Sequence, residues 1–250
     1  MSLTTILQYS TIDYRFLDAC LKQASKFSDK IIIPICDHFF DGEPENQELL
    51  EKSFEIINKY DKCEAYMFQW VGKKSTNIYY NVLSRLLGTT MADSDWLLYI
   101  DVDEIIDDGF DDWFNTIKDS NNCYWLTCYW YFREPIYQAT TTESAGLLIR
   151  KEHCNWNVES HNDRQQLFHV SNFINGNIQP ILSKNGTPFV HHYSWVRTKE
   201  EMLKKVQNWG HKHDKDWKQL VEAEFNKSFD GTDFVHGYHY NIVENKFNIK

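Results

Sequence analysis

The segment Trp96–Glu104 reads WLLYIDVDE and decides the fold that we expect for this chain. Its first five residues are bulky and largely apolar, which is typical of a strand buried on both faces of a parallel sheet. The apolar run stops at Asp101 and Asp103, and Glu104 follows directly. Ligands of open α/β sheets bind just beyond the carboxyl ends of such strands. The segment therefore predicts a central parallel strand that ends in a carboxylate site.

The residues before this segment alternate between apolar, strand-like runs and stretches with helical spacing of apolar side chains. A β-α-β-α rhythm implies right-handed crossovers, and it favours an α/β fold with a mainly parallel central sheet flanked by helices. The expected strands are Leu3–Gln8, Lys30–Cys36 and Glu64–Trp70, and the expected helices are Ile12–Phe27, Asn46–Tyr60 and Thr76–Leu87.

The pattern changes after Asp101 and predicts a more mixed sheet order in the second half of the chain. Thr198 and Glu201 have the spacing of a capping box, so we expect a long helix to begin there. We expect one domain with a nucleotide-sugar-binding half (1–104), an acceptor-side half (105–195) and a C-terminal helical extension (196–250). The further expected elements are a helix at Gly109–Ile117, strands at Cys123–Phe132, Ala145–Arg150 and Phe189–Tyr193, and the helix Thr198–Trp217.

The composition limits the classes of protein that fit. A net charge of −10 argues against nucleic-acid binding, which normally needs a basic surface. The sequence shows no long apolar run and no signal-peptide pattern, so we expect a soluble, intracellular (cytoplasmic) protein without a transmembrane segment. The six cysteines lack metal-ligand spacing, and we expect them to be reduced and mostly buried.

Asp101 and Asp103 are spaced to share one cation. Residues i and i+2 of an extended segment lie on the same face, so both carboxylates can point at one ion. Mg²⁺ and Mn²⁺ prefer oxygen ligands and often use only one or two carboxylates together with substrate phosphates. The structural alternative is a solvated acidic turn that caps the next helix through Asp107 or Asp108.

With these motifs, the chain resembles the GT-A-fold (Rossmann-like) glycosyltransferases of the family-2-like group. The resemblance runs from Leu3 to about Trp217 and includes LLYIDVDE and the later FVHHYSWVR (189–197). It implies that a D-x-D motif holds Mn²⁺ or Mg²⁺, which bridges the diphosphate of a UDP- or GDP-sugar. Asp103 would be the direct metal ligand, and Asp101 would contact the metal or the donor ribose.

The resemblance also implies a metal or diphosphate ligand from the late segment. Neighbouring residues of a strand face opposite ways, so only one of His191 and His192 can face the site. We favour His192 as the ligand, although a lone histidine is more often structural. Arg197 is expected to neutralise the diphosphate leaving group, and its alternative is ordinary surface charge at a helix start.

An inverting transfer needs a carboxylate base for the acceptor hydroxyl. Asp163 fits the position that relatives use, Glu159 is the second choice, and helix capping is the structural alternative for Asp163. For binding the nucleotide and diphosphate, the resemblance points to Gln8, Tyr9, Asp37, Lys73 and Asn77. The departure from the family lies at Cys36-Asp37-His38-Phe39, where only Asp37 matches the acidic pair of many relatives.

The sequence thus predicts a hexosyltransferase that transfers a sugar to a hydroxyl of a glycan or glycoconjugate. Two alternatives stay open. Haloacid-dehalogenase-type phosphohydrolases also end a buried strand in D-x-D, and Asp101 would then be the nucleophile. A non-catalytic glycan-binding relative would keep the fold without turnover.

Overall fold

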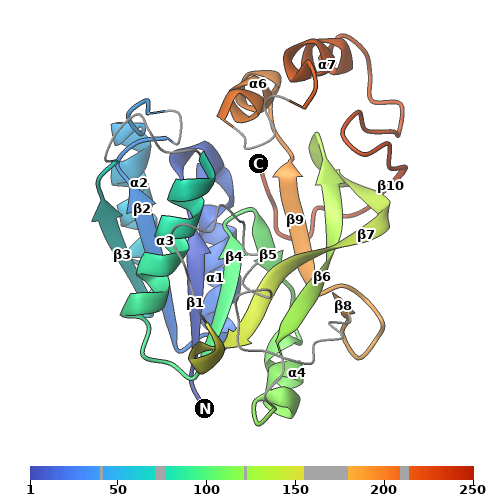
Figure 1. The fold of residues 1–250 in the computed structure, drawn as a ribbon. Helices are drawn as coiled ribbons and strands as arrows, with labels where there is room; N and C mark the ends of the chain where they lie inside the picture. The colour runs from blue at the N-terminus through green and yellow to red at the C-terminus, as the bar shows by residue number, and fades with distance from the viewer. Residues whose placement is uncertain (40–41, 71–76, 121–122, 155–179, 209–213) are drawn as a thin grey trace.

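The computed structural model of the 250-residue chain describes all residues except 40–41, 71–76, 121–122, 155–179 and 209–213 (Figure 1). Ten strands form one curled sheet, whose main path runs β3-β2-β1-β4-β7-β6-β9-β5. Strand β10 joins the sheet beside β7, and β8 joins it beside β6. None of the described helices combines the length and hydrophobicity needed to span a bilayer.

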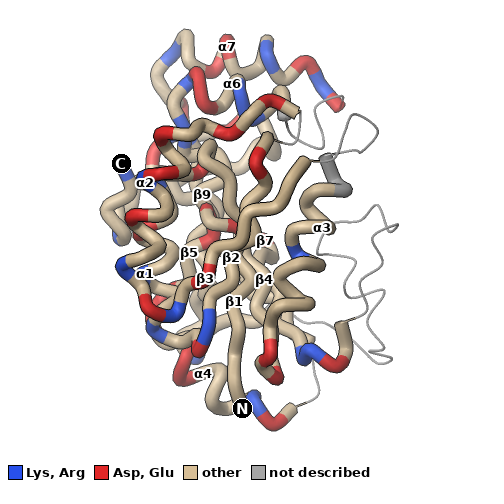
Figure 2. The backbone as a smooth tube through the Cα atoms, turned by 90° about the vertical axis from the view of Figure 1, so that its left-hand side faces the viewer, with Lys and Arg blue, Asp and Glu red and all other residues tan. Residues whose placement is uncertain are grey.

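The N-terminal half has the predicted parallel pairing. Strand β1 pairs in parallel with both β2 and β4, and β2 pairs in parallel with β3. Helices α1 and α2 cover one face of these strands and α3 covers the other (Figure 2). The strands are β1 (Leu3–Gln8), β2 (Lys30–Cys36), β3 (Cys63–Phe68) and β4 (Trp96–Asp101), and the helices are α1 (Leu17–Phe27), α2 (Gln47–Ile57) and α3 (Asn77–Met91).

The first expected helix is divided in two. A 3₁₀ helix occupies Thr11–Phe16, and the α-helix begins only at Leu17. The tighter first part places Asp13 and Arg15 against the C-terminal segment, where they pair with Arg197 and Glu201. These long-range ion pairs are invisible to local periodicity, which predicted one continuous helix.

The second half of the sheet is mixed, so parallel pairs do not dominate the described sheet as a whole. The long strand β7 lies antiparallel to β4, β6 and β10, whereas β6 and β9 are parallel. After Asp101 the chain turns at once into β5, with no crossover helix to return it in parallel. The elements are β5 (Glu104–Ile106), α4 (Phe110–Ile117), β6 (Tyr124–Phe132), β7 (Glu134–Arg150), β8 (Pro180–Ile181), β9 (Val190–Trp195) and β10 (Tyr240–Ile242).

The C-terminal region is less helical than predicted. The expected helix over Thr198–Trp217 is replaced by α6 (Lys199–Asn208) and α7 (Trp217–Phe225), separated by non-helical residues at 214–216. Asp216 accepts a hydrogen bond from the backbone N–H of Gln219 at 3.1 Å and so starts a new helix. The capping box is confirmed, because Thr198 and Glu201 bond reciprocally at 2.8 and 3.3 Å. Residues 226–250 contain β10 and no helix.

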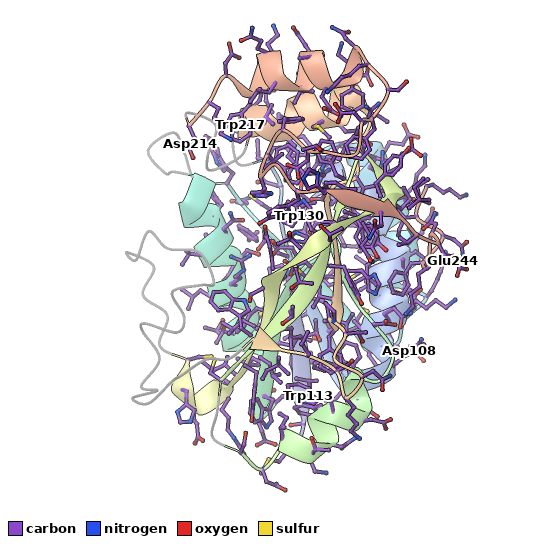
Figure 3. All side chains as sticks on the ribbon, turned by 90° about the vertical axis from the view of Figure 1, so that its right-hand side faces the viewer. Asp108, Trp113, Trp130, Asp214, Trp217 and Glu244 are labelled. Atoms are coloured by element: carbon purple, nitrogen blue, oxygen red, sulfur yellow. The ribbon has the colours of Figure 1, made fainter. Side chains whose placement is uncertain are left out.

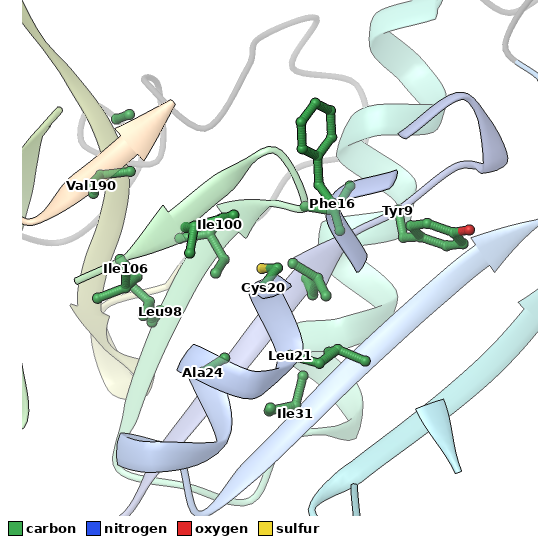
Figure 4. Packing of buried hydrophobic residues seen from close by; sticks show 14 of the residues in the cluster. Tyr9, Phe16, Cys20, Leu21, Ala24, Ile31, Leu98, Ile100, Ile106 and Val190 are labelled. Atoms are coloured by element: carbon green, nitrogen blue, oxygen red, sulfur yellow. The ribbon is translucent and has the colours of Figure 1, made fainter. Parts of the chain in front are cut away.

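The main core lies between the sheet and the helices α1 and α2. Figure 4 shows Cys20, Leu21 and Ala24 of α1 facing the apolar side chains of the strands. These three residues are at most 1% exposed, and so are Ile31 and Leu98 opposite them. The apolar run of β4 is therefore buried on both faces, as its sequence predicts. All six cysteines are free, and Cys63 and Cys154 are only half-buried.

Helix α3 packs so closely on β1 that Gly88 has no room for a side chain. A Cβ atom at Gly88 would lie 2.5 Å from Cγ2 of Ile6. We expect Gly88→Ala to lower the free energy of unfolding by about 1–2 kcal/mol, because overpacking costs about 1–3 kcal/mol and helix propensity returns up to about 1 kcal/mol. Urea unfolding measures this difference.

A double variant separates the clash from other effects of Gly88→Ala. In an Ile6→Ala background the contact is gone, so Gly88→Ala should become neutral or stabilising. The exposed Thr90→Ala on the same helix is the control for helix propensity. An unchanged cost in the double variant would contradict the close packing.

Candidate active site

Asp101 lies at the end of β4, where Gln8 of β1 is its parallel partner. Its Oδ1 accepts a hydrogen bond from Nη2 of Arg85 at 2.8 Å, and the Arg85 side chain is only 3% exposed. The backbone N–H of Asp101 donates to Oε2 of the fully buried Glu104 at 2.9 Å. The turn after β4 is thus held from two sides, and the half-exposed carboxylate of Asp101 has a fixed orientation.

Asp103 lies deeper, and it is 5% exposed. Its Oδ1 is 3.7 Å from Nε2 of His192, and its Oδ2 is 3.6 Å from Nη2 of Arg197. Oδ1 is buried, and no residue in the described part of the chain hydrogen-bonds it. Burial raises the pKa of Asp103, and the negative charge of Asp13 acts in the same direction. A buried carboxylate oxygen without a partner is costly, and a cation bound beside it would remove that cost.

The two neighbouring histidines of β9 face opposite ways. His192 is paired with Glu104 of β5, and its Nε2 lies 3.8 Å from Oε1 of that residue. His191 is buried on the other side, where its Nδ1 hydrogen-bonds the hydroxyl of Tyr131 at 2.7 Å. Its Nε2 is 3.4 Å from Oδ2 of Asp107. Of the two, His192 is the residue that lies beside the acids, and its role as a ligand stays a prediction.

Arg197 is enclosed by protein groups. Its side chain is 1% exposed, and it donates to the carbonyl oxygens of Ser194 at 2.8 Å and Ile12 at 3.1 Å and to the carboxylate of Asp13. Burial alone would lower the pKa of Arg197, but Asp13 and Asp103 raise it above its usual value. The arginine therefore balances two carboxylates within the protein, and it is not at a surface as the structural alternative held.

Lys205 and Asp13 are parts of this site that the sequence analysis missed. Nζ of Lys205 donates to Oγ of Ser194 at 2.8 Å. Burial and the nearby Arg197 lower the pKa of this lysine to about 8, whereas Asp103 and Asp13 act against that change. Lys205 lies on the same face of α6 as the buried Met202 and Val206. A charged residue on the buried face of a helix was the available signal.

The structure places the residues that were expected to bind the nucleotide in different surroundings. Gln8 lies beside Asp101, and its buried Oε1 has no hydrogen-bond partner in the ranges that the structure describes. Asp37 accepts hydrogen bonds from the backbone N–H of Trp70 and from Nδ1 of His38, both at 2.7 Å. Tyr9 is 3% exposed, and its hydroxyl hydrogen-bonds Ser53 of α2.

Several predicted residues lie outside the described part of the chain. They are Lys73 and the two candidate bases Glu159 and Asp163. Asn77 begins α3, and its side chain is not described. Within the described residues, no group of three or more His, Cys, Asp or Glu side chains is arranged to hold a metal ion by itself.

No protein-family model and no curated protein matches this sequence. The chain is similar in fold to solved structures of low sequence identity. S. aureus TarS 1-349 matches with a TM-score of 0.48 at 11% identity over 97% of this chain and 100% of that chain. HddC from Yersinia pseudotuberculosis matches with a TM-score of 0.42 at 7% identity, over 77% of this chain and 94% of that chain. The apo-form glycosyltransferase GlyE in Streptococcus pneumoniae TIGR4 matches with a TM-score of 0.41 at 13% identity, over 90% of this chain and 63% of that chain. Similarity at this level carries no function from those proteins to this chain.

His191 gives the stability of the protein a defined pH dependence. Burial lowers its pKa, although Asp107 opposes the shift. The unfolded chain therefore binds a proton at His191 at pH values where the folded protein does not, and stability falls as the pH drops below about 6.5. The free energy of unfolding of wild type minus that of His191→Gln should therefore decrease as the pH falls below about 6.5. The expected decrease is at most about 1.4 kcal/mol per pH unit.

Urea unfolding of both proteins at pH 8, 7, 6 and 5.5 measures this difference. The exposed His239 provides the control variant His239→Gln. A difference between wild type and His191→Gln that stays constant over this pH range would show that His191 is not kept neutral by burial.

Proposed function

We propose that this protein is a metal-dependent glycosyltransferase that moves a hexose from a UDP- or GDP-sugar to a hydroxyl of a glycan or glycoconjugate. The observation that carries the proposal is the buried carboxylate of Asp103, whose Oδ1 has no hydrogen-bond partner among the described residues and lies beside His192 at the carboxyl end of a parallel strand. This edge of an α/β sheet is where phosphate-bearing ligands bind.

The residues present fit Mn²⁺ or Mg²⁺. Asp103 offers an oxygen that no described residue hydrogen-bonds, Asp101 lies two residues away, and His192 adds a nitrogen beside Asp103. Sites for these ions often have fewer than three protein ligands. Waters and substrate phosphates fill the other coordination positions. When bound, such an ion neutralises the charge that develops on the diphosphate leaving group.

The protein's own groups have distinct parts in this proposal. Asp103 and His192 would hold the cation, and Arg85 fixes the orientation of Asp101 through its hydrogen bond. Arg197 keeps Asp103 and Asp13 close together by balancing their charge. Lys205 of α6 donates to Oγ of Ser194, the residue whose carbonyl oxygen also accepts a hydrogen bond from Arg197. We assign to Lys205 the electrostatic stabilisation of the diphosphate that was first expected of Arg197.

The chemical step needs a base in addition to these groups. A carboxylate takes the proton of the acceptor hydroxyl. At the same time the hydroxyl oxygen bonds to the anomeric carbon of the donor sugar, and the bond from that carbon to the diphosphate breaks. Asp163 is our candidate on the sequence alone, and Glu159 is the second candidate.

Asp103→Asn tests the assignment most directly. The change removes the negative charge and keeps the size of the side chain, so we expect at least a hundredfold loss of metal-dependent sugar transfer and of donor binding. A thermal-shift panel of UDP- and GDP-sugars with and without Mn²⁺ measures donor binding, because ligands that bind the folded state raise its stability. Turnover with the best donor is measured in parallel.

The matched control for this prediction is Asp108→Asn. Asp108 belongs to the same acidic stretch, but its side chain is 69% exposed and pairs with Lys26 at the surface. It should behave as wild type in both measurements. Full Mn²⁺-dependent turnover in Asp103→Asn would refute the proposed function.

Asp163→Asn tests the base. Removal of a base that acts only on the acceptor hydroxyl should lower kcat by at least about a hundredfold and leave donor affinity nearly unchanged. Steady-state kinetics with the donor found above give both quantities, and Glu159→Gln is the comparison variant. Equal losses of kcat and donor affinity in Asp163→Asn would contradict a base role.

A further inference from the structure

One face of the second half of the sheet carries a row of polar and aromatic side chains that begins at the candidate active site. Glu104 of β5 is paired with His192 of β9, and His192 is paired with Trp130 of β6. Paired residues of neighbouring strands point to the same face. The row therefore leads from the acids, across His192, to Trp130.

The row continues onto β7. Cys128 lies two residues before Trp130 and so shares its face, and Cys128 is paired with Glu143 of β7. Figure 3 shows Trp130 between Trp217 at the end of the molecule that carries α6 and α7 and Trp113 at the α4 end. Strand β6 with Trp130 thus lies between β9, which carries His192, and β7, which carries Glu143.

The C-terminal segment meets this row. The ring of Trp130 makes edge-on contacts with His192 at 4.8 Å and with His236 at 4.9 Å between ring centroids. His236 is stacked on Tyr238 with centroids 5.0 Å apart and planes at 24°. The hydroxyl of Tyr238 donates to Oε1 of Glu143 at 2.7 Å, and Nδ1 of His236 lies 3.9 Å from the same oxygen.

A single buried carboxylate fixes this segment. Asp233 is 3% exposed, and it accepts backbone N–H bonds from four residues of the turn, at distances of 2.6–3.3 Å. It also accepts a hydrogen bond from the hydroxyl of Tyr240 at 2.9 Å. Gly237 has a φ of +76° inside this turn, which a residue with a side chain rarely adopts. His236 and Tyr238 are therefore held in place before any ligand arrives.

The residue that anchors this turn in the core differs from the residues that the turn exposes. Val235 is buried among Phe132, Trp195 and Trp217 in a separate core cluster. In contrast, His236 is exposed and Tyr238 and Glu143 are half-buried. The indole N–H of Trp130 is buried and has no acceptor within the described part of the chain. An exposed imidazole stacked on a half-buried phenol ring beside a carboxylate is more polar and more accessible than packing in the core requires.

These groups match the chemistry of a sugar ring. The apolar C–H face of a pyranose packs on flat aromatic rings, and its hydroxyls pair with carboxylate and imidazole groups. We propose that Glu143, His236 and Tyr238, with Trp130 behind them, form a subsite for the sugar ring of a carbohydrate acceptor. This inference rests on the proposed function. It places the acceptor sugar on the far side of Trp130 from His192, since Trp130 contacts both His192 and His236.

Saccharide binding without donor and without metal tests the subsite separately. The probes are methyl α- and β-glycosides of glucose, galactose, mannose and N-acetylglucosamine, followed by saturation-transfer NMR. A ligand of this size should bind wild type with a Kd of about 1–10 mM. His236→Ala and Glu143→Gln should each weaken that binding by about fivefold or more, since each removes one sugar-facing group.

His239→Ala is the matched control, because His239 is an exposed histidine three residues beyond His236, where its Nδ1 hydrogen-bonds Thr232 at 3.2 Å. Its binding should equal that of wild type. Tyr238→Phe keeps the stacked ring and loses only the bond to Glu143, so it should weaken binding less than His236→Ala. An unchanged unfolding midpoint in urea shows that each variant is folded.

Two outcomes overturn the inference while leaving the proposed function intact. One is no saccharide binding by wild type while a nucleotide-sugar binds with Mn²⁺. The other is equal saccharide binding by wild type, His236→Ala and Glu143→Gln. If saccharides bind through these residues but no nucleotide-sugar binds with or without metal, the proposed function fails and the assignment as an acceptor subsite falls with it.

Discussion

The buried guanidinium of Arg197 is the interaction on which the candidate active site depends. It joins three segments that are far apart in the sequence, since it contacts Asp13 of the 3₁₀ helix, Asp103 after β4 and the carbonyl of Ser194 in β9. Two carboxylates and one guanidinium removed from water are tolerated only when they compensate one another. The loss of Arg197 would leave Asp13 and Asp103 uncompensated, and the position of Asp103 beside His192 would no longer be favoured.

The geometry of the sheet explains why the two proposed sites lie next to each other on one face. Strand β4 is parallel to β1, so its carboxyl end opens at the edge where phosphates bind. The immediate turn into β5 then sets Glu104 beside β9, and the parallel pairing of β9 with β6 sets His192 beside Trp130. A crossover helix after Asp101 would have separated these residues. The reversal at β4 thus connects the carboxylates with the aromatic row.

The candidate site was predictable in part. Asp101 and Asp103 follow from an apolar run that stops at acids, and the alternation of side chains along a strand required that only one of the two histidines face them. Lys205, Glu143 and His236 were not identified as site residues. Their neighbours come from distant segments, and nothing in the local pattern of 199–208 or 226–250 shows which face they meet. Arg197 was identified, but its enclosure by Asp13 and Ile12 depends on the 3₁₀ helix.

The sequence by itself determined the α/β class, the N-terminal parallel strands with their helices, and the carboxylates at the end of β4. These features follow from burial periodicity and capping, which act over a few residues. The mixed order of the second half was expected, but only the tertiary structure decided which strands pair there, the break between α6 and α7, the presence of β5 and β10, and the meeting of the C-terminal turn with Trp130. Strand pairing and ion pairs between distant segments fixed these features, because their free energy depends on partners that no local window contains.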